Sequence, residues 1–274
     1  MTEQLSPLAL QALAVVEESG AIISANHAHP HTIRHKGRID LVTETDIAVE
    51  AFLKERLATL APQAGFLAEE SAEDLSLPDT CWIIDPVDGT TNFAHGLPLT
   101  VTSVAYRLNG EIVLGIVNAP LLRECFIAEK GKGAWRNGER ISVSSVTACE
   151  NALVATGFPY EIASRVDEIL ERMRPVLSSC QGVRRCGAAA LDLAWTACGR
   201  FDAFYEDELS IHIKLTRLTP VRLEFSYEVI RENPRVLIAT GTTSHGMVSK
   251  DLVPVNVKKE HPKIYRMFEE CMDN

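Results

Sequence analysis

The chain has 274 residues, of which 46% are hydrophobic and 23% are charged, so it can bury a sizeable core in one or two domains. A net charge of −10 without a basic block disfavours nucleic acid and anionic membranes as partners. No apolar run reaches the length of a membrane span and the N-terminus lacks the basic start of a signal peptide, so we expect a cytoplasmic protein.

Two helices are predicted near the N-terminus from apolar residues at helical spacing. The first spans about 7–25. The second is expected to begin at a Thr45 cap and to bury Phe52 and Leu57 among others.

The most informative stretch is an apolar strand that runs directly into acidic residues. Cys81–Ile84 predict a buried strand with Asp85 at its end. Pro86 and Gly89 then prevent a regular continuation, which folds Asp85 and Asp88 towards one point. Because crowded carboxylates repel each other unless a hard cation lies between them, this pair predicts a Mg²⁺ site.

The same turn predicts an anion site. Gly89 lets the chain approach a ligand closely, and the N–H groups of Gly89 and Thr90 are free to hold a phosphate. A solvated Asp-Gly turn would be the simpler interpretation of the bare dipeptide, but the longer stretch DPVDGTTNF is too specific for it. Upstream, Glu69 and Glu70 are further candidate ligands, although a surface cap is an equally good interpretation of that pair.

The middle of the chain predicts an antiparallel sheet followed by helices. Segments 101–108 and 111–117 flank Asn109-Gly110, the strongest short hairpin signal in the sequence. An amphipathic helix is expected over 162–177. A helix over 187–199 is apolar on nearly all sides and is therefore expected to be buried.

Four segments follow one another along the chain: KGRIDLVTETD at 36–46, FLAEES at 66–71, DPVDGTTNF, and RCGAAALDLAWTACGRFDAFYE at 185–206. In residue pattern and in order along the chain, they resemble the motifs of the inositol monophosphatase family of Mg²⁺-dependent phosphomonoesterases. The resemblance covers about residues 8–206 and implies that family's layered α/β sandwich. Ala68 departs from the pattern, since the family carries glycine there.

The resemblance implies roles for the metal-binding residues. The first Mg²⁺ would be held by Glu69, Asp85 and the backbone carbonyl of Val87, and the second by Asp85 and Asp88. Thr90 would bind metal and, with Glu69, orient the attacking water. Two metals that activate water and neutralise the leaving oxygen make a side-chain nucleophile unnecessary.

Substrate contacts follow from the same resemblance. The N–H groups of Gly89 and Thr90 would hold the phosphate beside Asp88. Ala189 and Glu206 lie where the family contacts the inositol ring, so they would govern the choice of substrate.

The resemblance stops after Glu206. Where the family carries an Asp that ligates metal and contacts the leaving oxygen, this chain has Ile213. Loss of that ligand is expected to weaken the second metal and to impair catalysis.

The remaining residues predict half-buried antiparallel strands, because apolar and polar residues alternate at about 211–215 and 221–229. Asn233-Pro234 then turns the chain into a third strand at about 236–244.

The sequence of these strands resembles the C-terminal half of a hotdog-fold acyl-CoA thioesterase. The N-terminal half of that family, which carries the catalytic Asp, is missing. We predict a truncated phosphatase region at 1–206 and a partial thioesterase-like segment at 207–274. Recombination, a deletion or an assembly error could each have joined two such partial sequences. The alternative to a fusion is a phosphatase whose C-terminus has diverged.

The sequence therefore favours a Mg²⁺-dependent phosphomonoesterase for inositol 1-phosphate or a related polyol phosphate, acting as a homodimer. A catalytically dead fusion product or scaffold is the main alternative. An acyl-CoA thioesterase is disfavoured, because the front segment that carries that family's catalytic residues is missing.

Overall fold

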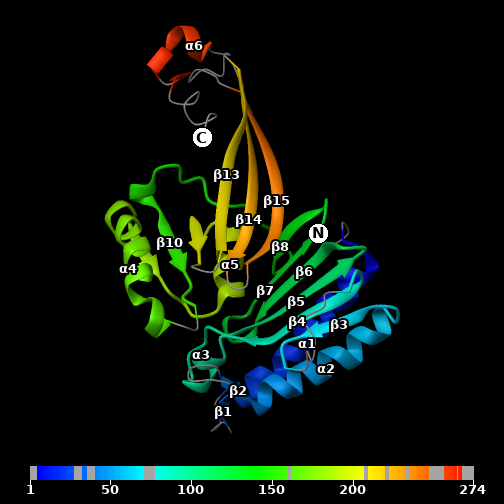
Figure 1. Ribbon diagram of the computed structural model, residues 1–274. Coiled ribbons are helices and arrows are strands. Elements are labelled where there is room, and N and C mark those ends of the chain that lie inside the picture. The colour runs from blue at the N-terminus through cyan, green and yellow to red at the C-terminus, as the bar shows by residue number, and fades with distance from the viewer. Residues whose placement is uncertain are drawn as a thin grey trace. The chain divides into compact units, whose positions relative to one another are not determined.

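The computed structural model describes residues 5–27, 33–35, 41–70, 78–159, 162–206, 209–219, 222–232, 235–246, 256–263 and 265–266. The chain forms two compact units, Met1–Tyr205 and Glu206–Asn274 (Figure 1). Residues 36–40 of the first resemblance segment and Ser71 of the second lie outside the described residues.

The first unit is built from alternating layers of helices and sheets (Figure 1). Helices α1 (Pro7–Asn26) and α2 (Glu44–Leu60) pack together on one face of a seven-stranded sheet. Helix α5 (Ala189–Ala197) packs on the other face and also contacts a three-stranded sheet, which α4 (Ile162–Ser179) covers. The layered α/β fold predicted for this part of the chain is confirmed.

The large sheet has the order β3-β4-β5-β6-β7-β8-β9, with only the β3–β4 pair parallel. Its strands are β3 (Gly65–Ala68), β4 (Cys81–Asp88), β5 (Val101–Leu108), β6 (Glu111–Ala119), β7 (Glu124–Glu129), β8 (Gly133–Arg136) and β9 (Glu139–Arg140). The small sheet has the order β11-β10-β12 with both pairs parallel. Its strands are β10 (Leu153–Thr156), β11 (Gly182–Arg184) and β12 (Ala203–Tyr205).

Short elements complete the first unit. Strands β1 (Ile33–His35) and β2 (Leu41–Thr43) form an antiparallel pair. The short helices are α3 (Thr90–Ala94), η2 (Pro120–Leu122) and η3 (Cys149–Asn151).

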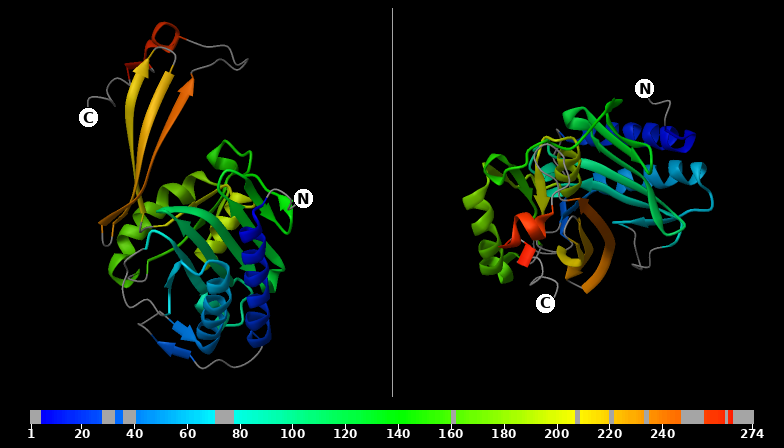
Figure 2. Two further views of the ribbon diagram at one scale, coloured as in Figure 1. Left: turned by 90° about the vertical axis from the view of Figure 1, so that its right-hand side faces the viewer. Right: turned by 90° about the horizontal axis from the view of Figure 1, so that it is seen from above.

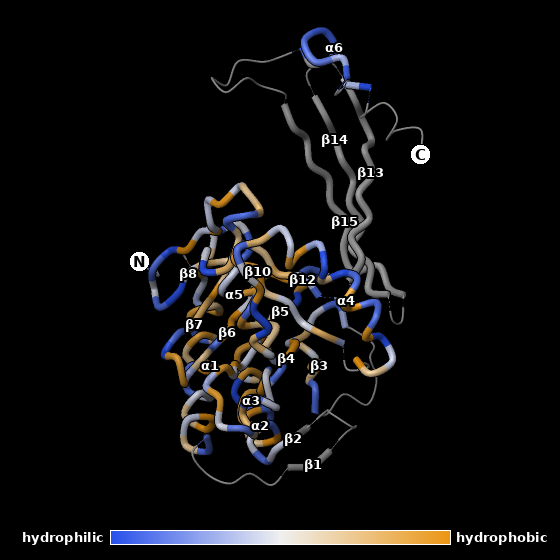
Figure 3. Tube along the Cα trace, turned by 90° about the vertical axis from the view of Figure 1, so that its left-hand side faces the viewer, coloured by the Kyte–Doolittle hydropathy of each residue, from blue (hydrophilic) through white to orange (hydrophobic). Residues whose placement is uncertain are grey.

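Strand β6 shows why both faces of the large sheet are covered. Ile116 is buried in the core that contains α1 and α2, whereas its neighbour Val117 packs in the cluster that contains Leu191 of α5. Successive side chains of a strand point to opposite faces, so apolar residues at adjacent positions require a helix layer on each side. Figure 3 shows hydrophobic positions recurring along β5, β6 and β7.

The hairpin between β5 and β6 forms where the sequence predicts it. Asn109 and Gly110 have φ values of 52° and 83°, as both central residues of a type I′ turn require. The backbone twist of a type I′ turn matches the right-handed twist of the strands that it joins.

Helix α2 begins two residues earlier than predicted. Its N-cap is Thr43 rather than Thr45, because Thr43 Oγ1 accepts a hydrogen bond from Thr45 N at 3.1 Å. The Asp46 carboxylate accepts from Thr43 N at 2.9 Å, which completes a capping box. The cap therefore uses Asp46, a residue that reappears below in the site.

Helix α1 is the one helix of the described residues that is long and apolar enough to cross a membrane. Val16 and Ile23, both 0% exposed, lie in the core that α1 shares with the large sheet. Core helices of this kind meet the same criteria of length and composition, so the finding is weak support for a membrane span.

Helix α5 is shorter and less buried than predicted. It spans Ala189–Ala197, and Gly199, with φ 75°, lies beyond its last residue. Leu191 is buried, but Leu193 is 54% exposed, so the prediction of burial on all sides is wrong. A single helix layer between two sheets leaves its lateral face uncovered among the described residues.

Glu124 of β7 connects the large sheet to α5. Its carboxylate accepts hydrogen bonds from Arg200 at 2.6 and 2.8 Å and from Trp195 Nε1 at 2.9 Å. Arg136 of β8 lies 3.6 Å away on the same side. These bonds, of which the Arg200 hydrogen bond has the largest effect, hold the pKa of Glu124 below its ordinary value.

We predict that Glu124→Gln lowers the free energy of unfolding by about 1–3 kcal/mol at pH 7, the range for hydrogen bonds to charged groups. A carboxyl whose pKa is depressed in the folded state stabilises above its unfolded pKa, and that stabilisation is lost as pH falls through the folded pKa. In urea denaturation, the free energies of unfolding of wild type and Glu124→Gln should therefore differ less at pH 3 than at pH 7. An equal difference at both pH values would contradict the prediction.

The second unit contains a three-stranded antiparallel sheet of order β13-β14-β15 (Figure 2). Its elements are β13 (Leu209–Thr219), β14 (Arg222–Glu232), β15 (Arg235–Gly246) and the short helix α6 (Val257–Glu260). The strands overlap the three expected from the sequence, and Ile213 lies opposite Tyr227 in the register. The resemblance to a hotdog thioesterase is not shown by this sheet and stays a prediction.

Candidate active site

Strand β4 delivers two carboxylates to one place through a bulge. Asp85 pairs with Ser103 of β5, but Asp88 pairs with Val101, so β4 carries one residue more than its partner between them. The strand thus continues to Asp88 and does not end at Asp85 as predicted. Pro86 has no N–H for the ladder, and its carbonyl accepts instead from Thr102 Oγ1 at 3.0 Å.

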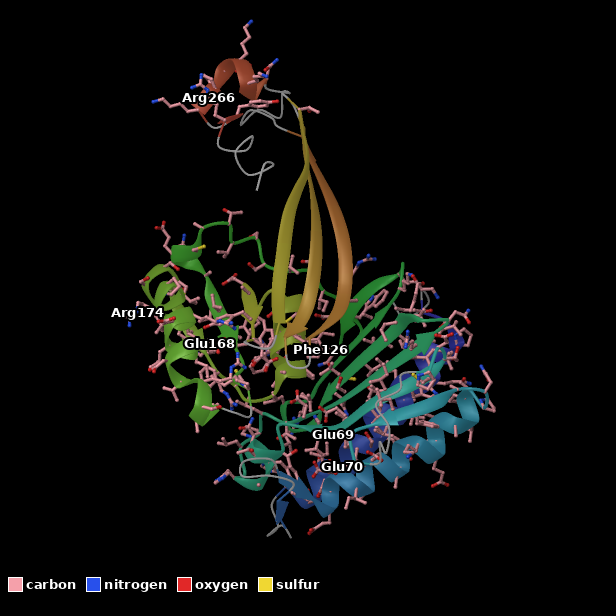
Figure 4. All side chains as sticks on the ribbon, viewed as in Figure 1. Glu69, Glu70, Phe126, Glu168, Arg174 and Arg266 are labelled. Carbon is pink, nitrogen blue, oxygen red and sulfur yellow. The ribbon has the colours of Figure 1, made fainter. Side chains whose placement is uncertain are left out.

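Glu69 reaches the same place from the neighbouring strand. Strands β3 and β4 are parallel with Ala68 opposite Ile84, so their carboxyl ends lie together. Glu69 N donates to Ile84 O at 3.2 Å, and, besides burial, the charge of the Glu69 side chain contributes to raising the pKa of Asp85. Figure 4 shows Glu69 and Glu70 side by side at the end of β3.

Glu70 has a different role from its neighbour. Its backbone N–H donates to Glu50 Oε2 at 2.8 Å, which ties the end of β3 to α2. Of the two acids left open by the sequence, Glu69 is therefore the one that the structure brings to Asp85.

The electrostatics of the acidic group are unfavourable without a cation. Burial raises the pKa of Asp85 to about 9, and the charges of Asp88 and Glu69 add to the effect. Burial also raises the pKa of Asp88 to about 7, although two backbone N–H groups oppose the shift. Asp85 Oδ1 is buried and has no hydrogen-bond partner.

Asp88 also caps helix α5. Its Oδ1 accepts from Ala189 N at 3.2 Å and its Oδ2 accepts from Ala190 N at 2.7 Å. Free N–H groups at a helix start favour an anionic partner, and α5 obtains it from a residue about 100 positions earlier in the chain. The predicted substrate residue Ala189 is thus in direct contact with the predicted metal ligand Asp88.

The turn after Asp88 has the conformation that only glycine adopts easily. Gly89 has φ 91° and precedes α3. A Cβ at this position would lie 2.7 Å from Leu99 O and 3.2 Å from Ala188 Cβ, so a side chain there would push two segments apart. The close approach keeps the backbone of Gly89 and Thr90 beside the acids.

Asp46 is a further residue of the site, which was not predicted from the sequence. Thr90 Oγ1 lies 3.1 Å from Asp46 Oδ1 and 2.9 Å from Val87 O, and its single proton serves these two acceptors. Asp46 is 1% exposed, and burial raises its pKa despite the hydrogen bonds from Thr43 and Thr90 that oppose the shift. Asp46 lies in the DLVTETD segment, which is one of the segments that resemble the family. That position in the motif could have identified Asp46 as a site residue.

The donor set fits a hard cation. Carboxylates of Glu69, Asp85 and Asp88 with the Val87 carbonyl supply only oxygen, the ligand type that Mg²⁺ prefers. Asp85 Oδ1 has no hydrogen-bond partner, and burial raises the pKa values of Asp85 and Asp88. A bound cation would relieve the repulsion between these acids. Among the described residues, no group of three or more His, Cys, Asp or Glu side chains already has the spacing of a metal site. The Asp88 carboxylate is bound to the N–H groups at the start of α5.

Glu206 belongs to the second unit, so its place in the site remains a prediction.

Residues 4–214, more than half of the chain, match the model of the inositol monophosphatase family. The chain belongs to this family. The match ends at 214 and not at 206 as the motifs suggested, so it includes the position of Ile213. Members of the family are phosphatases, which supports a phosphoric monoester hydrolase.

Curated relatives agree with the family assignment. An inositol monophosphatase of Dictyostelium discoideum is 41% identical over 201 residues, which cover 71% of this chain and 74% of the relative. The Nus factor SuhB of Escherichia coli K12 is 35% identical over 205 residues, which cover 74% of this chain and 77% of the relative.

Solved structures support the fold of the same region. The extragenic suppressor protein suhB of Bartonella henselae superposes with a TM-score of 0.70 at 35% identity, covering 75% of this chain and 80% of that one. An inositol monophosphatase of Thermotoga maritima gives a TM-score of 0.64 at 34% identity, covering 72% and 74%.

Proposed function

We propose that this family member is a Mg²⁺-dependent phosphomonoesterase that acts on a small phosphorylated polyol such as inositol 1-phosphate. The observation that carries the proposal is the buried Asp85 carboxylate, which has an unpartnered oxygen and lies with Glu69 and Asp88 beside the Gly89–Thr90 turn. A divalent cation placed there would offset part of the negative charge of the three acids and would attract the phosphate dianion.

The residues divide into metal ligands and phosphate contacts. Glu69, Asp85, the Val87 carbonyl and Asp88 would hold Mg²⁺, and the N–H groups of Gly89 and Thr90 would hold the phosphate. Bound Mg²⁺ supplies Lewis acidity, which polarises the phosphoryl oxygens and makes water a better nucleophile at neutral pH.

Thr90 and Asp46 provide a path for the proton of the attacking water. In this proposal the water gives a proton to Thr90 Oγ1 while Thr90 gives its own proton to Asp46. Asp46 is suited to accept it, because burial has raised its pKa and its Oδ1 already faces the hydroxyl at 3.1 Å. Glu69 would orient the water together with Thr90, as the family resemblance implies.

The C-terminal region bears on the rate of catalysis and on the partners of the protein. Ile213 stands at the position of the family's remaining acidic ligand, so we propose that the second metal binds weakly and that turnover is slow. We further propose that the region 207–274 is a thioesterase-like segment without catalysis of its own, and that the protein is a cytoplasmic homodimer. A catalytically dead scaffold is the competing function, and the assay below decides between them.

The test is release of inorganic phosphate from inositol 1-phosphate, glycerol phosphate and an aryl phosphate, each with Mg²⁺ and with EDTA. We expect Mg²⁺-dependent hydrolysis of all three with similar kcat/KM, because the region that would enclose the substrate is replaced. Absence of Mg²⁺-dependent release from every ester would reject the phosphatase and leave the scaffold. A strong preference for inositol 1-phosphate that Glu206→Ala abolishes would show that the substrate pocket is closed.

A further inference from the structure

The buried side chain of Asn92 joins two segments that are far apart in the sequence. Asn92 lies in α3 and is 7% exposed. Its Nδ2 donates to Leu99 O at 2.7 Å, which closes the loop after α3, and to Cys186 O at 2.9 Å, 94 residues later. Both protons of the amide are therefore used by backbone carbonyls.

The contact between these segments is close. A Cβ on Gly187 would lie 3.2 Å from Asn92 Nδ2, and a Cβ on Gly89 would lie 3.3 Å from Gly187 O. Glycines at both positions therefore allow the turn after β4 to touch the residues before α5 without a side chain between them.

Cys186 is in turn fixed to α5. The Asp192 carboxylate, in the first turn of α5, is 1% exposed, and the thiol and backbone N–H of Cys186 oppose the rise that burial causes in its pKa, although Asp192 Oδ1 has no hydrogen-bond partner. A displacement of the Cys186 carbonyl would therefore be transmitted to the start of the helix, where Ala189 N and Ala190 N meet Asp88.

We propose that Asn92 is a positioning residue of the site, whose side-chain amide holds the start of α5 so that its first N–H groups remain on Asp88. Loss of the amide would let the start of α5 move away and would leave Asp88 free to turn. The effect on catalysis rests on the proposed function, whereas the effect on α5 does not.

A purely structural role would make Asn92 equivalent to any other buried asparagine. Asn118 of β6 is the matched control, because it is 5% exposed and its Nδ2 also donates to a backbone carbonyl, Val16 O at 3.0 Å. Replacement of either by Asp keeps the shape of the side chain and turns a donor into an acceptor, which costs two buried hydrogen bonds at Asn92 and one at Asn118.

The first experiment measures amide hydrogen exchange of the full chain in EDTA for wild type, Asn92→Asp and Asn118→Asp. We expect exchange over residues 187–197 to rise by about tenfold in Asn92→Asp only, the change for a loss of about 1.4 kcal/mol of local stability. Unchanged exchange at 187–197 in Asn92→Asp, or an equal rise in both variants, would overturn the proposal. If Asn92→Asp does not fold, Asn92→Ala gives the same comparison with no added charge.

The second experiment measures Mg²⁺ affinity by calorimetry together with kcat and KM. We expect Asn92→Asp to weaken Mg²⁺ binding by about tenfold while Asn118→Asp binds as wild type does, because only Asn92 controls Asp88. Wild-type affinity in Asn92→Asp would overturn the proposal. If wild type shows no turnover, the proposed function fails, but the exchange result still supports or overturns the role of Asn92.

Discussion

Asp85→Asn is expected to remove Mg²⁺-dependent phosphate release, with kcat/KM falling by about a thousandfold or more. Asp85 is the residue to which the resemblance assigns both metals, and its Oδ1 is buried without a partner. An amide cannot carry the charge that a hard cation requires. Calorimetry should show one tight Mg²⁺-binding event in the wild type, if Ile213 stands in place of the remaining ligand as we propose, and none in the variant.

The same substitution should stabilise the protein in EDTA. The pKa of Asp85 is raised to about 9 by burial and by its acidic neighbours, so folding is opposed at neutral pH by a carboxylate that must be neutralised. Asparagine removes that penalty, and we expect the free energy of unfolding to rise by about 2 kcal/mol. A variant that is less active and more stable is the signature of a site in which the charge serves binding rather than folding.

Asp202→Asn is the control for both measurements. Asp202 accepts from Leu153 N at 2.6 Å and from Ser144 Oγ, and the Ser144 bond holds its pKa below the ordinary value. Its replacement should lower stability and leave phosphate release unchanged. Strong Mg²⁺ binding by Asp85→Asn, or lost activity in Asp202→Asn, would contradict the assignment of the site.

Thr90→Val is expected to lower kcat by about a hundredfold to a thousandfold. Valine has the shape of threonine but cannot pass a proton, so the contact from Thr90 Oγ1 to Asp46 Oδ1 is lost while the turn keeps its backbone. The resulting loss in kcat at saturating substrate separates proton transfer from binding.

The neighbouring residue supplies the control for this variant. Thr91 lies one position later in α3 and is exposed. Thr91→Val makes the same chemical change on the solvent side and should retain full kcat. Equal activity of the two variants would show that the Thr90 hydroxyl takes no part in the reaction.

Local patterns in the sequence were sufficient to predict most elements of the first unit. The Asn109-Gly110 turn, the apolar run of β4 and the spacing of α1 depend on residues close in the chain, so propensity and period reveal them. The motif DPVDGTTNF likewise predicts that Asp85 and Asp88 lie together. Element boundaries were less accurate, as at Thr43 and Asp88, because caps and bulges depend on single hydrogen bonds.

Only the tertiary structure decided how these acids are used. The contacts from Thr90 to Asp46, from Asp88 to Ala190, and from Asn92 to Cys186 join residues separated by 44, 102 and 94 positions. No periodicity encodes such pairs, since they arise when β3 and β4 end together and α5 packs across the sheet. The sequence determined which residues have the chemistry of a metal and phosphate site, and the packing of α2 and α5 against β4 determined which partner each of them meets.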